Sequence, residues 1–500
     1  MMTYLSIPGR PALLGGFALS AFLLTGCRDD VPPTAARTPA TPSLSIIPGT
    51  SAVAAQYAAD FVATAATGSA MNVGGDVVGT SYLDTGCGSF CLPPKQTVVW
   101  RGGLRIVLPS LPGFTGIYPS AINAQGWIVG LAGVPGTQTR AVLWRPSGAS
   151  TYTITDLGVL RGTTLSEAGG LDDLGRVVGW STTSNIIGPS APFLWTLGGG
   201  MVNLATQGFP NEKPLALSPG GTVATSGHWF RLGNPASVTP LTAPPPSFRP
   251  PGTFATAIND AGEQARFLVP TSSQSLIYLF RYHPSTGWQQ LSTLPTGGLS
   301  RFGVGSVNAS GDITATVQSI GVIAAGPNGL AQPLSSRLSP AYLGATIGIG
   351  GPMNASGEIL SQVMIGRSQR LMRLVPVTPC TGNCVRSSQV VMKGSFVQDS
   401  AHPGQCFQGG KAYNLVTASV KVTTETGSVL ANARVNGRFL DDYWTDRPVS
   451  VVTNLRGIAK FTNKGLCGVG AVAFLVDKVT AGTRTFDRTA GVVANSVIPK

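Results

Sequence analysis

The sequence has few charged residues, few histidines and no long apolar run beyond its start. Only 11% of its 500 residues are charged and three are histidine, which excludes long, charge-covered helices and leaves little material for acid–base chemistry. The G-x-S-x-G, P-loop and H-E-x-x-H motifs are absent, so common signatures of hydrolases, nucleotide binders and zinc proteases are missing. After residue 26 no segment approaches a run of about 18 apolar residues, which excludes a later membrane-spanning helix.

Turn-forming residues are abundant instead. The chain contains 65 Gly and 38 Pro, and hydrophobic residues make up 43% of it. This composition is typical of short strands joined by tight turns. A chain of 500 residues is also too long for one hydrophobic core. The sequence therefore predicts an all-β protein with more than one domain.

The formal net charge of the chain is +13. A basic surface attracts anionic glycans, lipid headgroups or nucleic acid. The clusters of Arg and Lys with interleaved aromatic residues that form a nucleic-acid groove are absent. We therefore expect a diffuse basic surface and no nucleic-acid partner.

The N-terminus predicts export and lipid anchoring. After Arg10, residues 12–24 form an apolar run that is too short to span a bilayer, so residues 1–26 are interpreted as a signal peptide. The run ends in L-T-G-C at residues 24–27, which resembles the lipobox of bacterial lipoproteins. This resemblance implies an acylated Cys27 and, because Arg28 follows, a place at the outer membrane or cell surface. An ordinary signal with an incidental cysteine is the alternative. Residues 27–43, rich in Pro and Thr, predict an extended linker.

One motif occurs seven times between residues 70 and 357. It consists of a small residue, an apolar residue, Asn, Asp or Ser, two variable residues and Gly, as in A-I-N-A-Q-G from Ala121. The spacings at the Asn/Asp/Ser position are 51, 49, 46, 41, 49 and 46 residues, a period typical of propellers or solenoids. A short polar residue three positions before Gly indicates a type I turn, and the flanking apolar residues predict a β-hairpin.

Each repeat contains about four predicted strands. The hairpin is followed in most copies by an apolar segment ending in an aromatic residue, such as Trp100, Trp144 or Trp195, and then by one more short strand. Four strands in such a unit form a propeller blade. We therefore predict a seven-bladed β-propeller over residues 44–377. The last copy lacks a fourth strand, so Tyr57–Val62 is expected to pair beside the strand around Met372 and close the ring.

The same features resemble the extracellular HAF-repeat family. Its units read D-L-G, then S-x-A-x-x-I-N-x-x-G-x-V-V-G, then F-L-W, and the match is close between Thr155 and Trp195. It fades after Gly262, where copies lose the V-V-G and the Trp. The resemblance covers residues 56–377 and implies an extracellular, propeller-like protein. It brings no known catalytic residue.

The pattern changes after residue 377. Alternating apolar segments at residues 414–422, 429–439, 451–461 and 471–479 predict an Ig-like β-sandwich over residues 378–500. This segment resembles the Ig-like modules appended to secreted bacterial hydrolases. Those modules are accessory, so the resemblance implies no activity.

Six cysteines remain once Cys27 is assigned to lipid, and an even number in an exported protein predicts disulfides. Proximity favours the pairs Cys87–Cys91 and Cys380–Cys384, which leaves Cys406 and Cys467. Fifteen pairings are possible, and a zinc site is the alternative. Because no His lies at metal-binding spacing, we expect neither a metal nor another cofactor.

Candidates for chemistry are sparse. Four carboxylates follow the repeated turns: Asp76, Glu263, Asp312 and Glu358. If the repeats superpose in a ring, these side chains gather at one rim, where they could act as paired catalytic acids or bind calcium. The alternative is that they simply face solvent. Tyr443 and Trp444 could stack on a sugar or pack at the edge of the sandwich. His228, His283 and His402 lie in no nucleophile motif.

These observations favour a binding protein over an enzyme. The leading hypothesis is a surface-anchored, non-catalytic lipoprotein that engages a glycan or protein through propeller loops. The alternative is a propeller hydrolase or lyase acting on extracellular polysaccharide, because propellers host both functions. No binding residue can be assigned from the sequence.

Overall fold

The computed structural model describes residues 56–498, with the exception of 65, 83–94, 115, 135–137, 184–189, 250–255, 273–275, 293–301, 399–411, 442–445 and 467–470. The predicted signal peptide and linker, and Cys27, Cys87, Cys91, His402, Cys406, Tyr443, Trp444 and Cys467, lie outside the described residues. Within the described part the protein is all-β, with two short 3-10 turns and no α-helix. No helix there is long and apolar enough to cross a membrane.

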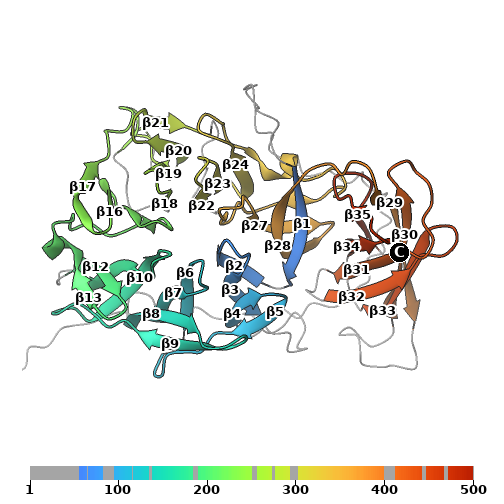
Figure 1. The fold of residues 1–500 in the computed structure, drawn as a ribbon, viewed down its shortest axis with the longest axis horizontal. Helices are drawn as coiled ribbons and strands as arrows, with labels where there is room; N and C mark the ends of the chain where they lie inside the picture. Colours follow the sequence, from blue (N-terminus) through green and yellow to red (C-terminus); the bar gives the residue numbers. More distant parts are fainter. Residues whose placement is uncertain are drawn as a thin grey trace, which may run out of the picture. The chain divides into compact units, whose positions relative to one another are not determined.

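Seven four-stranded antiparallel sheets follow one another along residues 56–377 (Figure 1). The first sheet contains β2 (Ala66–Met71), β3 (Val77–Tyr82), β4 (Lys95–Arg101) and β5 (Leu104–Val107). The second contains β6 (Ile117–Ile122), β7 (Ile128–Val134), β8 (Gln138–Pro146) and β9 (Tyr152–Asp156). The third contains β10 (Leu165–Leu171), β11 (Val177–Thr182), β12 (Ser190–Thr196) and β13 (Gly200–Asn203), and the 3-10 turn η2 (Leu204–Gln207) follows it.

The next four sheets repeat this arrangement. The fourth contains β14 (Ala216–Leu217), β15 (Thr222–Ala224), β16 (His228–Arg231) and β17 (Asn234–Pro240). The fifth contains β18 (Thr256–Ile258), β19 (Gln264–Leu268), β20 (Tyr278–His283) and β21 (Gly287–Gln290). The sixth contains β22 (Gly303–Val307), β23 (Ile313–Val317), β24 (Ile320–Ala324) and β25 (Gln332–Pro333), followed by η3 (Leu334–Arg337). The seventh contains β26 (Thr346–Ile347), β27 (Ile359–Ile365), β28 (Ser368–Val377) and β1 (Gln56–Ala63).

The N-terminal strand completes the seventh sheet. Strand β1 pairs antiparallel with β28, and Phe61 lies opposite Met372. The pairing expected between Tyr57–Val62 and the strand around Met372 is therefore confirmed. Ala59 and Leu374, which lie opposite each other in this pair, are both buried. The two ends of the repeat region are therefore held together: β1, from the N-terminal end, is the fourth strand of the sheet that the C-terminal end forms.

Each repeated motif forms the turn between the first two strands of a sheet. In the second sheet Asn123 Oδ1 accepts hydrogen bonds from the backbone N–H groups of Gln125 (3.1 Å) and Trp127 (2.9 Å). The glycine of the motif takes a positive φ in all seven copies, 74° at Gly126 for example. Only glycine adopts this left-handed conformation without steric cost, which explains its place in the repeat.

Two further four-stranded sheets follow the repeats. One contains β29 (Cys384–Gln398), β30 (Ala412–Thr424), β33 (Ile458–Leu466) and β35 (Thr485–Phe486). The other contains β31 (Arg434–Asp441), β32 (Asp446–Val452), β34 (Val472–Thr480) and β36 (Ala494–Val497). Val420, Phe439 and Phe474 are buried in one hydrophobic cluster between them. That cluster continues to Met372 of the seventh sheet, so the C-terminal sheets and the repeat region share buried contacts.

Candidate functional site

The motif residues of neighbouring sheets are joined by hydrogen bonds. Asn72 Nδ2 donates to Asn123 O (3.0 Å), and Asn123 Nδ2 donates to Asp172 O (3.1 Å). In the later copies Asn259 Nδ2 donates to Asn308 O (2.9 Å). The last motif returns to the first, because Asn354 Nδ2 donates to Asn72 O (3.1 Å). The turn that shapes each hairpin thus also connects it to the next one.

The turn of the fourth sheet is also hydrogen-bonded to the next sheet, but through residues other than Asn. Its motif residue is Ser218, whose hydroxyl donates to the carboxylate of Asp260 in the fifth sheet. Thr222 Oγ1 also donates to Asp260 O (3.2 Å), and Gly220 N donates to Asp260 Oδ1 (2.8 Å). Asp260 of the following copy therefore provides the hydrogen bonds between sheets that an Asn amide provides in other copies.

The carboxylates that follow the turns are structural acceptors. Asn259 Nδ2 donates to Glu263 Oε2 (2.7 Å), and Asn354 Nδ2 donates to Glu358 Oε2 (2.8 Å). Asp76 accepts in the same way from Asn72 (3.2 Å), and Asp312 accepts from Asn308 (2.8 Å). The structure thus pairs each carboxylate with the amide of its own turn.

Each of these carboxylates is also bound by the third strand of its sheet or by the residues next to that strand. Arg101 forms a 2.9 Å ion pair with Asp76, and Arg373 lies 3.8 Å from Glu358. Gly326 N donates to Asp312 Oδ1 (2.6 Å). Because Asp76 and Glu358 have only 16% and 17% exposed side chains, these groups do not simply face solvent. No group of three or more His, Cys, Asp or Glu side chains in the described part of the chain is arranged to hold a metal ion.

A second polar cluster lies at the opposite end of the fourth sheet. Successive turns of antiparallel strands alternate between the two ends of a sheet, so the β15–β16 turn lies away from the Ser218 motif. Glu212, in the loop before β14, reaches this turn. Its Oε1 lies 2.9 Å from His228 Nδ1, and its Oε2 accepts from Thr225 Oγ1 (2.5 Å) and Gly227 N (2.9 Å).

The Glu212 carboxylate is held in its charged form. Partial burial by itself would raise the pKa of Glu212, but the hydrogen bonds from Thr225, Gly227 and His228 outweigh it and lower the pKa below its usual 4.5. The Glu212 and His228 side chains remain 26% and 34% exposed. Because Glu212 engages Nδ1, the other ring nitrogen of His228, Nε2, can face a ligand.

Two basic residues flank the Glu212–His228 pair. Lys213 Nζ lies 3.4 Å from Glu167 Oε2 of β10 in the third sheet. Arg266 of β19 is 1% exposed, and its Nη2 donates to Thr225 O (2.5 Å). Thr225 thus connects the buried Arg266 with the partly exposed Glu212. The arrangement offers a carboxylate acceptor and an imidazole at the surface beside Lys213, with the Arg266 guanidinium buried behind Thr225.

The sequence contained a signal for part of this cluster. In most repeats the position five residues after the turn Asn/Asp is apolar and the position two residues later is small, as in Val77 and Gly79. The fifth copy places Gln264 and Arg266 there. Glu212 carries no such signal, because it lies in a connecting loop without a repeated pattern. The sequence pattern thus indicates His228 as a candidate but not its partner Glu212.

A second histidine–carboxylate contact among the described residues has a structural role. His283 Nε2 lies 3.6 Å from Glu263 Oε1, while its Nδ1 accepts from Ser285 N (3.2 Å). Both ring nitrogens are therefore engaged within the fifth sheet. This pair is looser than Glu212–His228 and lies at the end of the sheet that carries the motif turn.

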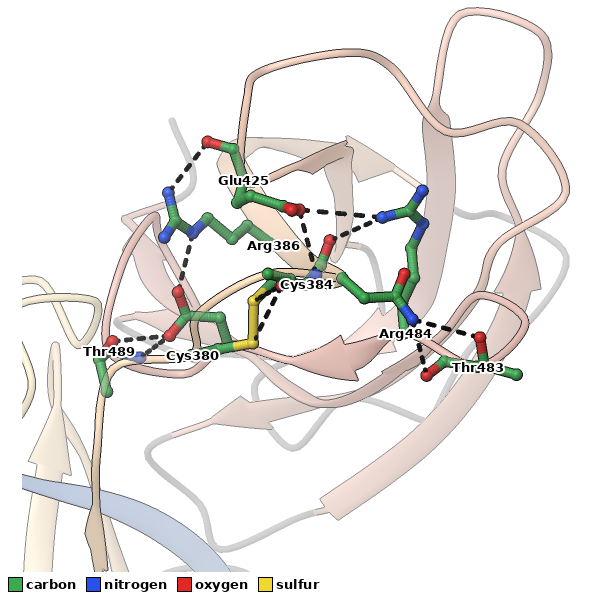
Figure 2. The surroundings of a disulfide bond; sticks show 10 residues. Cys380, Cys384, Arg386, Glu425, Thr483, Arg484 and Thr489 are labelled. Atoms are coloured by element: carbon green, nitrogen blue, oxygen red, sulfur yellow. Dashed lines mark hydrogen bonds and ion pairs between the residues drawn. A yellow bond between two sulfur atoms is a disulfide. The ribbon is translucent and has the colours of Figure 1, made fainter.

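The expected disulfide between Cys380 and Cys384 is present at the start of the C-terminal sheets (Figure 2). Cys384 N donates to Glu425 Oε2 (3.1 Å), and Arg484 lies 3.8 Å from the same carboxylate. Arg386 forms a 2.8 Å ion pair with Asp487. Hydrogen bonds and ion pairs engage the polar side chains around this disulfide, which indicates a structural crosslink.

Comparisons with known proteins show no family. No family model matches the chain, and no curated protein matches it. Among solved structures, a protein assigned as a gluconolactonase shares 12% identity at a TM-score of 0.30, covering 64% of this chain and 92% of its own. A triple arginine-to-alanine mutant of AofleA from Arthrobotrys oligospora shares 9% identity at a TM-score of 0.25, covering 81% of this chain and 90% of its own. These similarities are too low to assign a function.

Proposed function

We propose that the protein is an exported, lipid-anchored binding protein of the cell envelope, with a closed seven-bladed propeller and an Ig-like accessory module. The seven consecutive four-stranded sheets and the completion of the seventh by β1 support the ring. The hydrogen bond from Asn354 back to Asn72 supports its closure. Cys27 is the proposed acylation site, followed by the linker at residues 28–43.

The proposed ligand is a glycan, bound by the loops around Glu212 and His228. One observation carries this proposal: Glu212 and His228 form a 2.9 Å pair whose side chains are still partly exposed. Sugar hydroxyls both donate and accept hydrogen bonds, so a fixed carboxylate beside an imidazole suits them. The carboxylates that follow the repeated turns support the same site indirectly. They already accept hydrogen bonds from the Asn side chains of their own turns, so they are less available to a ligand than Glu212 and His228.

The same pair supports a second candidate function. An imidazole whose Nδ1 is held by a carboxylate is the arrangement of a general base. His228 could thus remove a proton in the cleavage of an extracellular polysaccharide. The described residues around the pair contain no established nucleophile motif, so binding remains the first proposal.

A glycan array with the purified protein tests both functions. We expect the wild type to bind a subset of glycans, and His228→Gln and Glu212→Gln to weaken that binding at least tenfold. His283→Gln is the matched control, because it alters a histidine–carboxylate contact at the other end of the neighbouring sheet. Cleavage of the bound glycan that His228→Gln abolishes would establish the enzyme instead. Binding that all three variants retain, or capture of peptides in place of glycans, would overturn the proposal.

A further inference from the structure

The contact between the fourth and fifth sheets differs from the other contacts between neighbouring sheets. Hydrophobic clusters of buried residues join the first sheet to the second, the second to the third, and the third to the fourth. Others join the fifth to the sixth, the sixth to the seventh, and the seventh to the first. None of these clusters, over the residues that the structure describes, contains members of both the fourth and the fifth sheet.

Polar side chains occupy this contact instead. Gln264 and Arg266 alternate with Ala265 along β19, so both face the fourth sheet, where Arg266 meets Thr225. From the other side Trp229 of β16 faces the fifth sheet, because a Cβ at Gly262 would lie 2.9 Å from its ring. We call this set, Trp229, Gln264 and Arg266, the polar seam.

All three side chains of the polar seam carry a buried donor without an acceptor. Arg266 Nη1, Gln264 Nε2 and Trp229 Nε1 have no hydrogen-bond partner among the described residues. Gln264 and Arg266 are at most 1% exposed. Burying a donor without an acceptor is unfavourable, so three such donors in the contact between the fourth and fifth sheets point to an acceptor from outside the chain.

The charge of the seam is also not neutralised. Arg266 donates to two neutral oxygens, Gln264 Oε1 (2.8 Å) and Thr225 O (2.5 Å). No ion pair within 4.0 Å joins its guanidinium to a carboxylate in the described part of the chain. Burial lowers the pKa of Arg266 to about 10, and the attraction of Glu212 only partly opposes this. Arg266 therefore still carries its positive charge at neutral pH, inside the protein.

We propose that the polar seam is a binding site for a small monovalent anion, either a halide or a short carboxylate. The anion accepts hydrogen bonds from Arg266 Nη1 and Gln264 Nε2 and balances the guanidinium charge. Since Thr225 O accepts from Arg266 and Thr225 Oγ1 donates to Glu212, the anion also holds the β15–β16 turn. Thr225 connects the seam to the proposed glycan site, but the anion proposal does not rest on glycan binding.

Thermal unfolding at constant ionic strength tests the proposal, with sodium chloride or sodium acetate replacing sodium gluconate, whose six-carbon anion is much larger than chloride or acetate. A ligand that binds only the native state stabilises it in proportion to ln(1 + [L]/Kd). Above Kd, each tenfold rise in free anion should therefore lower the unfolding equilibrium constant tenfold. Comparison of the two salts distinguishes a halide from a carboxylate.

Arg266→Met should remove this dependence on the anion. Arg281→Met is the matched control: Arg281 is equally buried in the same sheet, but it faces the sixth sheet, and Glu263 and Asp312 act on its charge. We expect Arg281→Met to lower stability and keep the anion response of the wild type. Bromide soaked into crystals should give anomalous density beside Arg266. A wild type with equal stability in all three salts, and no bromide in the seam, would overturn the proposal and indicate ordered water as the acceptor.

Discussion

At the scale of the residue, the repeated Asn has two functions that follow from its two amide atoms. Its Oδ1 accepts from the backbone of its own turn, and in four of the five Asn copies its Nδ2 donates to a backbone carbonyl of the next copy. The exception is Asn308, whose Nδ2 lies 3.8 Å from Met353 Sδ. Asp offers no such donor, and Ser is shorter. This explains why the third and fourth copies, with Asp172 and Ser218, use Arg176 and Asp260 as additional partners.

Asn354 is the residue at which this double role can be measured. Asn354→Ala removes the bond to Asn72 O and leaves buried N–H groups without an acceptor, so we expect a loss of about 1–3 kcal/mol in the free energy of unfolding. Urea denaturation measures this loss. Asn454→Ala is the control, because the exposed Asn454 caps a similar turn through its Oδ1. An equal loss in the two variants would show that the bond between sheets contributes nothing.

Glu212 predicts a pH dependence at the same scale. Its pKa is lowered in the folded state, so its charged form stabilises the protein above the ordinary value of 4.5, and this contribution is lost as the pH falls through the folded-state pKa. We therefore expect the urea midpoints of wild type and Glu212→Gln to differ most at neutral pH and to converge on acidification. A difference that grows towards low pH would contradict the lowered pKa.

At the scale of the element, β1 decides whether the repeat region has a free edge. Ala59 N donates to Tyr342 Oη (2.9 Å), and Ala59 lies opposite Leu374 in the ladder with β28. Ala59→Pro removes this donor and introduces a ring into the middle of a buried strand, so we expect a loss of about 3 kcal/mol or more.

Thermal unfolding compares Ala59→Pro with Gln56→Pro. Gln56 is the exposed first residue of the strand, where proline is tolerated, so that variant should unfold near the wild type. If Ala59→Pro also unfolds near the wild type, the strand does not hold the seventh sheet. Exposure of the β28 edge should in addition promote association of the Ala59→Pro variant, which sedimentation detects.

At the scale of the whole molecule, the proposed anchor depends on one thiol. Cys27→Ala removes the acyl attachment, so we expect the variant to leave the membrane fraction in detergent phase separation. The measurement needs the full chain expressed in a bacterium that processes lipoproteins. Replacement of Arg28 by Ala is the control, because it alters the same segment and keeps the thiol. Continued partition of Cys27→Ala into the detergent phase would refute lipid anchoring.

Local patterns in the sequence were sufficient for much of the architecture. The Asn/Asp/Ser and Gly spacing predicted turns that the structure contains in all seven copies, since a positive φ at Gly and a short polar acceptor are local requirements. The unmatched strands at the two ends of the repeats predicted the pairing of Phe61 with Met372. Short spacing predicted the Cys380–Cys384 disulfide.

The candidate sites were decided by tertiary structure. Glu212 and His228 are brought together by a loop and a turn whose sequences follow no repeat, and Arg266 meets Thr225 only because consecutive sheets lie side by side. The carboxylates at Asp76 and Glu358 were candidates for chemistry in the sequence, but their turn amides occupy them in the fold. Hydrogen bonds such as Arg266 to Thr225 join residues about 40–50 positions apart, so they cannot be predicted from local periodicity. The sequence by itself therefore determined the repeating unit, and the packing of one unit against the next determined which polar groups are available to a ligand.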